Sequence, residues 1–412
     1  MSARRHDNIH RRYSEQSSTI SNDAPNHYTV GSRNNGLPCS TGQRKVLMQN
    51  IATLVKQINK ERHNYSDILV KDGESFQFRL PSGYARTQTE PVESQDILNF
   101  LREAGKSDGT MDYNEIAASN GGHMDFAITF DDVRYRCNLF RFGGVGRLGM
   151  SMRKLNDNIP SLSDLALPRL AKSFADRATG LVLCTGATGS GKSTTLAAMI
   201  DHINSTRPGH IITLEDPIEY IQRNKKSSVT QREIGEDVST FAHGLKAALR
   251  EDPDVILIGE IRDRETCEAA LAAAETGHLV LSTLHTTSAP KTIERLLDFF
   301  HGDEKNAVQS VISSVLTGVI SQVLPPSLDG KSRVLVAEVM GNFSNISSTI
   351  RNAKLQQLPN EMAQGFKDGQ TLLNKELVRF VSEGHISKEV ARMYSYSPFE
   401  FDAELKASRG AN

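Results

Sequence analysis

Hydrophobic and polar residues change their spacing along the chain, and these changes predict four parts. Residues 1–45 are rich in Ser, Asn, Arg and Gly and hold few large apolar residues, which predicts a disordered polar tail. Residues 46–159 mix one helical repeat with short alternating runs, which predicts a small α+β domain. Residues 160–344 alternate strand-like with helix-like runs, as is typical of a parallel sheet. Residues 345–412 are predicted to form a helical C-terminal region.

The second part contains a predicted β-hairpin. Residues 124–130 and 133–140 alternate apolar with polar side chains, and Asp131 and Asp132 between them mark a turn. The segment that follows carries several glycines, which are expected to loosen it. These glycines are Gly143, Gly144, Gly146 and Gly149.

In the third part, the apolar runs that predict strands are continuous, as expected for strands that are buried on both faces. They lie at residues 181–184, 210–214, 255–258, 278–282 and 334–338. Amphipathic spacing predicts helices in the same part, including one that covers residues 305–324. Polar residues interrupt this last stretch, and no run of 18 or more apolar residues exists, so no transmembrane segment is predicted.

Composition narrows the class of protein. The 412 residues include 48 Lys and Arg against 49 Asp and Glu, so the formal net charge is -1 and no direct binding of nucleic acid is expected. The four cysteines form no C-x-x-C pair, which argues against a tetracysteine zinc module and a disulfide framework. The first residues lack the apolar core of a signal peptide, so a cytoplasmic protein with reduced thiols is predicted.

A glycine-rich loop follows the first of these strands and fits the pattern G-x-x-x-x-G-K-[ST] at every defined position. A buried strand precedes the loop and a helix follows it, as the motif requires. The glycines allow backbone N–H groups to converge on phosphate oxygens at the N-terminus of a helix. Lys192 adds charge toward the β- and γ-phosphates, and the Ser193 hydroxyl can bind Mg²⁺. The residues predicted to bind nucleotide are Gly186, Ala187, Thr188, Gly189, Ser190, Gly191, Lys192, Ser193 and Thr194.

Carboxylates and histidines lie at the ends of other predicted strands. Glu260 comes just after the 255–258 strand, where open parallel sheets place their ligand crevice. A carboxylate there can hold Mg²⁺ through water or orient a water for hydrolysis. Glu215, Asp216 and Glu219 supply a second acidic cluster at another strand end. His278 and His285 are seven residues apart, so a straight strand would point them to opposite sides, and only His285 is expected to reach a γ-phosphate.

Four segments taken together resemble the secretion and type IV pilus ATPases. They look like the Walker A, Asp box, Walker B and His box of that family, in the right order and spacing. They lie at residues 186–193, 212–219, 249–263 and 276–289. The closest similarity is to the PilT/PilU group of pilus retraction ATPases. The resemblance implies a RecA-like P-loop core with a PAS-like N-terminal domain, in an ATPase that assembles as a homo-hexamer.

The resemblance also implies roles for individual residues. Lys192 and Ser193 would bind ATP and Mg²⁺, and Glu215 would help to organise the metal. Glu260 would be the catalytic carboxylate, and His285 would sense the γ-phosphate. The family also brings arginines from the N-terminal domain of a neighbouring subunit, which stabilise charge during phosphoryl transfer. The candidates on this chain are Arg134, Arg136, Arg147 and Arg153.

The same resemblance implies a partner, a location and a task. The ring would act in the cytoplasm on an inner-membrane platform protein of a pilus or secretion machine. Pilus-assembly members usually carry a tetracysteine insert, and its absence here favours retraction and twitching motility. The retraction group's Ala-Ile-Arg motif stands here as Thr349-Ile350-Arg351, and the polar tail is longer than expected. These departures keep an ATPase of a conjugative or type IV secretion system as an alternative.

A scaffold and a DNA motor are two further classes of function that compete with a pilus or secretion ATPase. A nucleotide-gated scaffold with little turnover would have no need of Glu260 beside the P-loop. A DNA-translocating motor would require a basic groove with interleaved aromatic residues, a pattern that this near-neutral sequence lacks.

Overall fold

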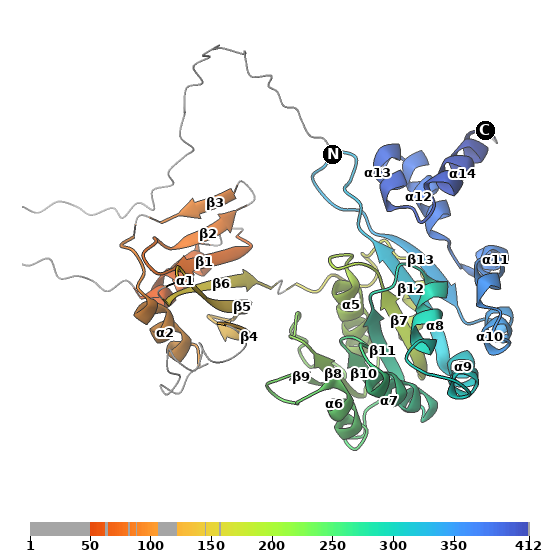
Figure 1. Ribbon diagram of the computed structural model, residues 1–412, viewed down its shortest axis with the longest axis horizontal. Coiled ribbons are helices and arrows are strands. Elements are labelled where there is room, and N and C mark those ends of the chain that lie inside the picture. The colour runs from red at the N-terminus through yellow and green to blue at the C-terminus, as the bar shows by residue number, and fades with distance from the viewer. Residues whose placement is uncertain are drawn as a thin grey trace, which may run out of the picture. The chain divides into compact units, whose positions relative to one another are not determined.

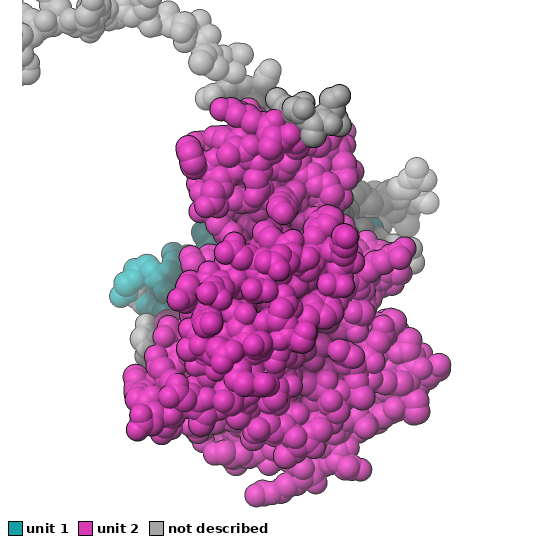
Figure 2. All heavy atoms as spheres, turned by 90° about the vertical axis from the view of Figure 1, so that its right-hand side faces the viewer, with its two compact units in different colours: residues 1–109, 140–151 teal, residues 110–139, 152–412 magenta. Residues whose placement is uncertain are grey.

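The computed structural model describes residues 50–61, 65–80, 83–87, 89–105, 122–144, 146–155 and 158–410, and the predicted polar tail at 1–45 lies outside them. Contacts divide the chain into two units. The first consists of residues 1–109 and 140–151, and the second of residues 110–139 and 152–412. Figure 2 shows one face of the second unit in magenta.

Six strands form the first sheet, in the order β3-β2-β1-β6-β5-β4 (Figure 1). They are β1 Asp67–Lys71, β2 Gln77–Leu80, β3 Gly83–Arg86, β4 His123–Phe130, β5 Val133–Phe142 and β6 Arg147–Lys154. Two amphipathic helices, α1 (Ile51–Lys60) and α2 (Ser94–Glu103), contact each other. This part is therefore α+β as predicted, while its likeness to a PAS domain stays a prediction.

The predicted hairpin is confirmed, because β4 and β5 are neighbours in the sheet. Asp131 and Asp132 have φ values of 54° and 58°, the left-handed conformation that a two-residue hairpin turn requires and that Asp tolerates. The expectation of a loosened segment after the hairpin is wrong for Gly149, which lies within β6. Gly143 and Gly144 form the turn before this strand, with φ values of 75° and 70°. A Cβ at Gly149 would press against the ring of Phe140 on β5, so this glycine permits close packing within the strand.

Seven strands form the second sheet, in the order β13-β12-β7-β11-β10-β8-β9. They are β7 Gly180–Thr185, β8 His210–Glu215, β9 Ser228–Glu233, β10 Val255–Ile258, β11 Leu279–Leu284, β12 Leu316–Val323 and β13 Val336–Gly341. The pairs from β12 to β9 are parallel, and β13 pairs antiparallel with β12. This largely parallel sheet confirms the predicted α/β class.

Helices cover both faces of this sheet, because its strands alternate their side chains between two cores. Leu181 and Leu183 on β7 pack in one core with helices α6 to α9, whereas Val182 and Cys184 pack in the other with α5. These helices are α5 Lys192–Thr206, α6 Phe241–Ala248, α7 Arg264–Glu275, α8 Ala289–Leu297 and α9 Glu304–Val315, and the short α4 (Arg169–Ser173) precedes β7. Strands β7, β10 and β11 are buried along their whole length, which explains their continuous apolar runs.

The predicted helix at 305–324 is correct only for its first half. Helix α9 ends at Val315, and the following residues form β12, which lies between β7 and β13. A Cβ at Gly318 would collide with the ring of Phe174 and the carbonyl oxygen of Met340, so the strand can pack here only with glycine. The apolar residues of this segment have helical spacing, but pairing with a strand on each side makes it a strand.

The helical C-terminal region is also confirmed. Its helices are α10 Ser344–Arg351, α11 Leu358–Gln364, α12 Leu373–Ser382, α13 Lys388–Tyr394 and α14 Pro398–Gly410. Helices α12 to α14 share a small core with Val336 of β13, and Figure 1 shows them gathered at that end of the second sheet. Within the described ranges, every helix is too short or too polar to cross a membrane.

Candidate active site

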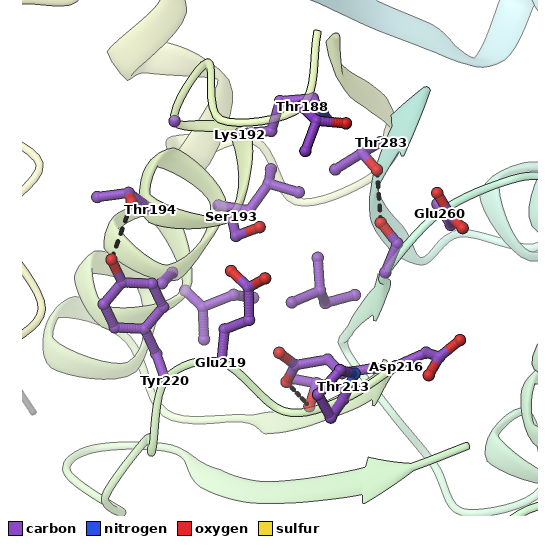
Figure 3. Close-up of a pocket in the computed structure, with 18 of the residues that line it drawn as sticks. Thr188, Lys192, Ser193, Thr194, Thr213, Asp216, Glu219, Tyr220, Glu260 and Thr283 are labelled. Carbon is purple, nitrogen blue, oxygen red and sulfur yellow. Dashed lines mark hydrogen bonds between the residues drawn. The ribbon is translucent and has the colours of Figure 1, made fainter. Parts of the chain in front are cut away.

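A pocket of about 410 Å³ opens in the second unit at the carboxyl ends of β8, β10 and β11. The P-loop forms one wall, and the segments that follow the three strands form the others (Figure 3). This is the edge where parallel sheets bind ligands, because the connections that leave neighbouring strands diverge there. Its volume lies in the range of small-molecule sites.

The P-loop has the backbone geometry that phosphate binding needs. Gly191 immediately precedes α5 and has a φ of 90°, which side chains rarely adopt. At Gly186, a Cβ would collide with Ser190 Oγ and with the carbonyl oxygen of Gln322 on β12. The loop is therefore wrapped tightly around the first turn of α5 and backed by β12. Ser190 Oγ is buried and has no hydrogen-bond partner among the described residues, so a polar group remains available in the loop.

Lys192 projects from the first turn of α5 and is 8 % exposed. Its Nζ donates hydrogen bonds to the carbonyl oxygens of Gly186 and Ala187, at 2.9 and 3.1 Å. Burial lowers the pKa of Lys192, while the nearby Glu219 carboxylate opposes that change. The ammonium group is thus held against the loop backbone, where it faces the pocket.

Two carboxylates stand opposite the P-loop on the segment that ends β8. Figure 3 shows the Glu219 carboxylate directed toward Ser193 at the start of α5. Glu215 Oε1 accepts hydrogen bonds from Thr213 Oγ1 at 2.7 Å and from Gln231 Nε2 at 3.1 Å. Burial raises the pKa of Glu215, and the charge of Glu219 adds to this effect. The two glutamates therefore stand on the wall opposite the P-loop, and Glu219 is directed toward Ser193.

A second cluster joins the ends of β10 and β11. His285 Nε2 lies 3.2 Å from Glu260 Oε2, and Arg262 forms an ion pair with the same carboxylate. Thr283 Oγ1 donates to the carbonyl oxygen of Gly259 at 2.6 Å, which fixes the backbone that carries Glu260. Burial, together with the positive charges of Lys192 and Arg262, lowers the pKa of His285. His285 is therefore neutral at pH 7 and can share a hydrogen bond with Glu260.

The structure brings most predicted site residues together and separates others. Lys192, Ser193, Glu215, Glu260 and His285 all line the one pocket. His278 lies just before β11, at its other end, where its Nδ1 is 2.9 Å from the carbonyl oxygen of Ala273.

The predicted arginines lie on two strands of the first sheet. Arg134 and Arg136 are on β5, and Arg147 and Arg153 are on β6. Arg147 donates to the carbonyl oxygen of Asp72, forms an ion pair with the carboxylate of that residue, and stacks over the ring of Phe142. Arg136 and Arg153 are exposed. Arg147 thus has a structural role within the first unit.

Several residues of the pocket are not found by sequence reasoning. Tyr220 hydrogen-bonds to Thr194 Oγ1 at 2.8 Å and so ties the segment after β8 to α5 (Figure 3). Gln231 holds both Glu215 and the carbonyl oxygen of Tyr220. It lies on β9, a polar edge strand whose sequence gives no apolar signal. Thr283 could have been found, since it ends an apolar run on the same edge as Glu260.

The donor set at the P-loop fits Mg²⁺, although no cluster of three His, Cys, Asp or Glu side chains that could hold a metal occurs among the described residues. Mg²⁺ prefers oxygen ligands, keeps several waters, and is usually held by one or two carboxylates together with substrate phosphates. The Ser193 hydroxyl, faced by the Glu219 carboxylate and with Glu215 on the same wall, provides such oxygens. The fit is to a metal that binds together with a phosphate ligand.

A glycine loop between a buried strand and a helix, a lysine held against that loop, and carboxylates at the neighbouring strand ends define a P-loop nucleotide-binding protein. Within that class, the chain belongs to the Type II/IV secretion system protein family, whose model matches residues 45–392. The family assignment agrees with the resemblance seen in the four sequence motifs.

Individual relatives narrow the comparison. The chain is 45% identical over 270 residues to the twitching motility protein of Neisseria gonorrhoeae, which covers 65% of this chain and 72% of the relative. It is 39% identical over 338 residues to the type IV pilus retraction ATPase PilT of Pseudomonas aeruginosa. This alignment covers 82% of this chain and 96% of the relative. A crystal structure of the pilus retraction motor PilT with bound ADP matches with a TM-score of 0.75 and 39% identity, over 85% of this chain and 98% of that one.

Proposed function

We propose that this protein is a Mg²⁺-dependent ATPase that powers a type IV pilus, with pilus retraction and twitching motility as its task. The names of the relatives that cover most of the chain support the pilus assignment. One observation of the site carries the enzymatic part. Glu260 and His285 meet beside Lys192 in one pocket, so a carboxylate and a neutral imidazole face the position that a γ-phosphate would take.

The P-loop would bind the phosphates. The loop ends at the positive end of α5, which favours phosphate, and Lys192 would exchange its two carbonyl acceptors for phosphate oxygens. Ser193, with Glu215 and Glu219 opposite, would hold Mg²⁺. When bound, Mg²⁺ supplies charge neutralisation on the phosphate oxygens.

Glu260 would position the attacking water and take its proton. The water oxygen then bonds to the γ-phosphorus while the bond from that phosphorus to the oxygen retained by ADP breaks. His285 would hold the Glu260 carboxylate in place and contact the phosphoryl group, since it stays neutral at pH 7. Arg262 adds positive charge beside the same carboxylate.

The ring assembly belongs to the same proposal. The active form would be a homo-hexamer in the cytoplasm that acts on an inner-membrane platform protein of the pilus. Arg136 and Arg153 are exposed on the first sheet, so they could reach the pocket of a neighbouring subunit and stabilise charge in the transition state. Arg147 was predicted for the same role, but its contacts with Asp72 and Phe142 make it the weaker candidate.

Three proteins test the enzymatic proposal: the wild type, Lys192→Ala and Glu260→Gln. We expect Glu260→Gln to bind ATP with wild-type affinity and to hydrolyse it about 100-fold more slowly or worse, because only the proton acceptor is lost. Lys192→Ala should lose both binding and turnover. If Glu260→Gln hydrolyses ATP at the wild-type rate, or the wild type barely turns over, a nucleotide-gated scaffold replaces the proposal.

Mixing variants tests the shared site. Arg136→Ala and Glu260→Gln should each be inactive alone, whereas a mixture should regain activity because some interfaces then combine an intact arginine with an intact glutamate. Light scattering on the same samples should show hexamers when the specific rate rises. If the protein stays a monomer and its specific ATPase rate does not depend on protein concentration, the proposed hexamer is not part of the mechanism.

An ATPase of a conjugative or type IV secretion system is the second candidate. It is favoured by the departure at Thr349-Ile350-Arg351, which lies on α10 and packs there against α9, where Gln309 Nε2 donates to the carbonyl oxygen of Ile350. Complementation decides between the two. Restored twitching in a pilus-bearing strain that lacks its own retraction ATPase supports the pilus assignment, and restored plasmid transfer without twitching supports the alternative.

A further inference from the structure

One carboxylate outside the nucleotide pocket is buried between two cores. Glu338 lies in the middle of β13 and is 3 % exposed. Val336 on the same strand packs in the core of α12 to α14, whereas Met340 packs in the core beneath α7 to α9. A buried carboxylate is costly unless both of its oxygens are satisfied. Both oxygens of Glu338 are therefore expected to have hydrogen-bond donors at this junction.

The two oxygens of Glu338 cap two helices. Oε1 accepts a hydrogen bond from the backbone N–H of Ala289 at 2.8 Å, and Oε2 accepts one from that of Leu373 at 3.3 Å. Ala289 is the first residue of α8, and Leu373 is the first residue of α12. First-turn N–H groups have no partner within their own helix, and the positive end of the helix dipole favours a carboxylate. A single side chain thus holds together the starts of two helices from different cores.

Helix α8 leads directly back to the nucleotide pocket. Only three residues separate His285 from Ala289. Thr292 in the first turn of α8 holds residues 286–288 in place. Its hydroxyl contacts Thr286 Oγ1 at 2.7 Å and donates to the carbonyl oxygen of Ser288 at 2.8 Å. The position of the His285 loop therefore follows the position of the N-terminus of α8.

Helix α12 is joined to β13 in the same place. Thr371, two residues before α12, exchanges two backbone hydrogen bonds with Val339, at 3.0 and 3.1 Å. The segment before α12 thus extends the edge of the second sheet, and Glu338 sits beside this contact. A movement of α12 relative to β13 would act first on the bond from Leu373 to Glu338.

We propose that Glu338 is a positioning residue that couples the C-terminal helices to the His285 loop of the nucleotide site. The inference rests on the proposed ATP hydrolysis. A carboxylate suits this task because both of its oxygens accept, whereas a glutamine would turn an NH₂ group toward one of the two N–H donors. Burial raises the pKa of Glu338 to about 7, and the two backbone N–H groups oppose this change. The charged form is therefore costly to bury, so its two hydrogen bonds, and not a gain in stability, account for a glutamate at this position.

Glu338→Gln in the full-length protein tests the coupling by kinetics at pH 8, where the carboxylate is ionised. We expect kcat to fall about tenfold, with the KM for ATP changed by less than about twofold, because the phosphate-binding loop is untouched. The effect should be non-additive with His285→Ala, since both changes act through the same loop. Glu376→Gln is the matched control, because Glu376 is a buried glutamate on α12 that pairs with Arg379. Wild-type kinetics of Glu338→Gln, or additivity with His285→Ala, would overturn the proposal.

Amide hydrogen exchange gives a readout that does not depend on turnover. Glu338→Gln should speed exchange in two separate segments, residues 286–292 and 373–378, whereas Glu376→Gln should affect only α12. Faster exchange in one segment alone would show that Glu338 caps a helix without joining the two. If the wild type and Lys192→Ala show the same ATPase activity, the proposed function is wrong. The exchange result then still shows whether Glu338 joins the two segments.

A second pair of variants covers the case in which Glu338→Gln does not fold. Leu373→Pro removes the N–H group that Glu338 accepts, and proline is tolerated there because Leu373 is the first helical residue and Leu372 before it is extended. Leu373→Ala removes the same side chain but keeps the N–H. We expect Leu373→Pro to reproduce the tenfold loss in kcat and Leu373→Ala to stay within about twofold of wild type. Equal effects of the two variants would overturn the proposal.

Discussion

His285 Nε2 lies 3.2 Å from Glu260 Oε2, so two strand ends that are 25 residues apart in sequence meet in one hydrogen bond. The bond links a carboxylate that can take a proton to an imidazole that burial and two nearby cations keep neutral. Arg262 and Lys192 supply those cations. The geometry explains why the two residues should act together.

The lowered pKa of His285 predicts the shape of the pH profile. Because the proton binds only below the ordinary value of 6.5, kcat/KM should stay constant from pH 8 to about pH 6.5 and fall below it. His285→Gln should lower kcat by about tenfold or more and remove this acid limb. His278→Gln is the control, since His278 lies at the other end of β11, and it should keep the wild-type profile. An acid limb that survives in His285→Gln would contradict the assignment.

Tyr220 and Thr194 form a second pair with a measurable effect. Their 2.8 Å hydrogen bond ties the segment after β8 to the helix of the P-loop. Tyr220→Phe should weaken the binding of a fluorescent ATP analogue by about threefold to tenfold, the value of one ordinary hydrogen bond. Thr194→Val should do the same, and the double variant should lose no more than either single one. Additive losses would mean that each hydroxyl acts on its own.

Gly318 in β12 predicts a stability effect. A Cβ there would collide with the Phe174 ring and the Met340 carbonyl oxygen, so Gly318→Ala should lower the free energy of unfolding by about 1–3 kcal/mol. Gly330→Ala is the comparison, because Gly330 has a φ of 67° but open space around its Cα, and it should cost only the backbone strain of about 1 kcal/mol. Urea unfolding of both variants measures the difference. If Gly318→Ala costs no more than Gly330→Ala, the packing account of β12 is wrong.

The raised pKa of Glu338 predicts how stability depends on pH. The folded protein keeps a proton on Glu338 up to about pH 7, whereas the unfolded chain releases it near 4.5. The free energy of unfolding should therefore fall as pH rises through this window, by about 3 kcal/mol at most. Glu338→Gln should lack this component, so the difference in stability between variant and wild type should shift in favour of the variant from pH 5 to pH 8.

The same comparison must separate Glu338 from its ionisable neighbours. The groups on the elements packed against it are Lys291, Glu294 and Arg295 on α8, Lys375, Glu376 and Arg379 on α12, and Tyr396 between α13 and α14. They are unchanged between the two proteins, so their own titration cancels in the difference. A difference in stability that does not vary with pH would show that Glu338 is already ionised throughout this range.

Local patterns made the centre of the second sheet predictable from the sequence. Strands β7, β10 and β11 are buried along their length, so their continuous apolar runs and the glycine loop after β7 carry the signal themselves. Glu260 and His285 could be placed because the ends of parallel strands meet at one edge.

Other features depended on partners that are distant in the sequence. The residues of β12 have the spacing of an amphipathic helix, and only their pairing with β7 and β13 makes them a strand. β9 carries few apolar residues, so Gln231 and its contact with Glu215 could not be foreseen. The orientation of Glu219 and Tyr220 depends on the path of the chain after β8 rather than on any periodic pattern.

The pairing of β7 with β12 has a consequence for the protein during its synthesis on the ribosome. The P-loop follows β7, yet its back wall is Gln322, whose Oε1 accepts from the Cys184 thiol 138 residues earlier in the chain. A nascent chain that has exposed only the glycine loop and α5 therefore has two unpaired edges on β7 and an open loop, because β11 and β12 come later in the chain. Nucleotide cannot stabilise the emerging domain until about residue 323 has left the exit tunnel. Until then, the exposed edges of β7 are open to pairing with other chains.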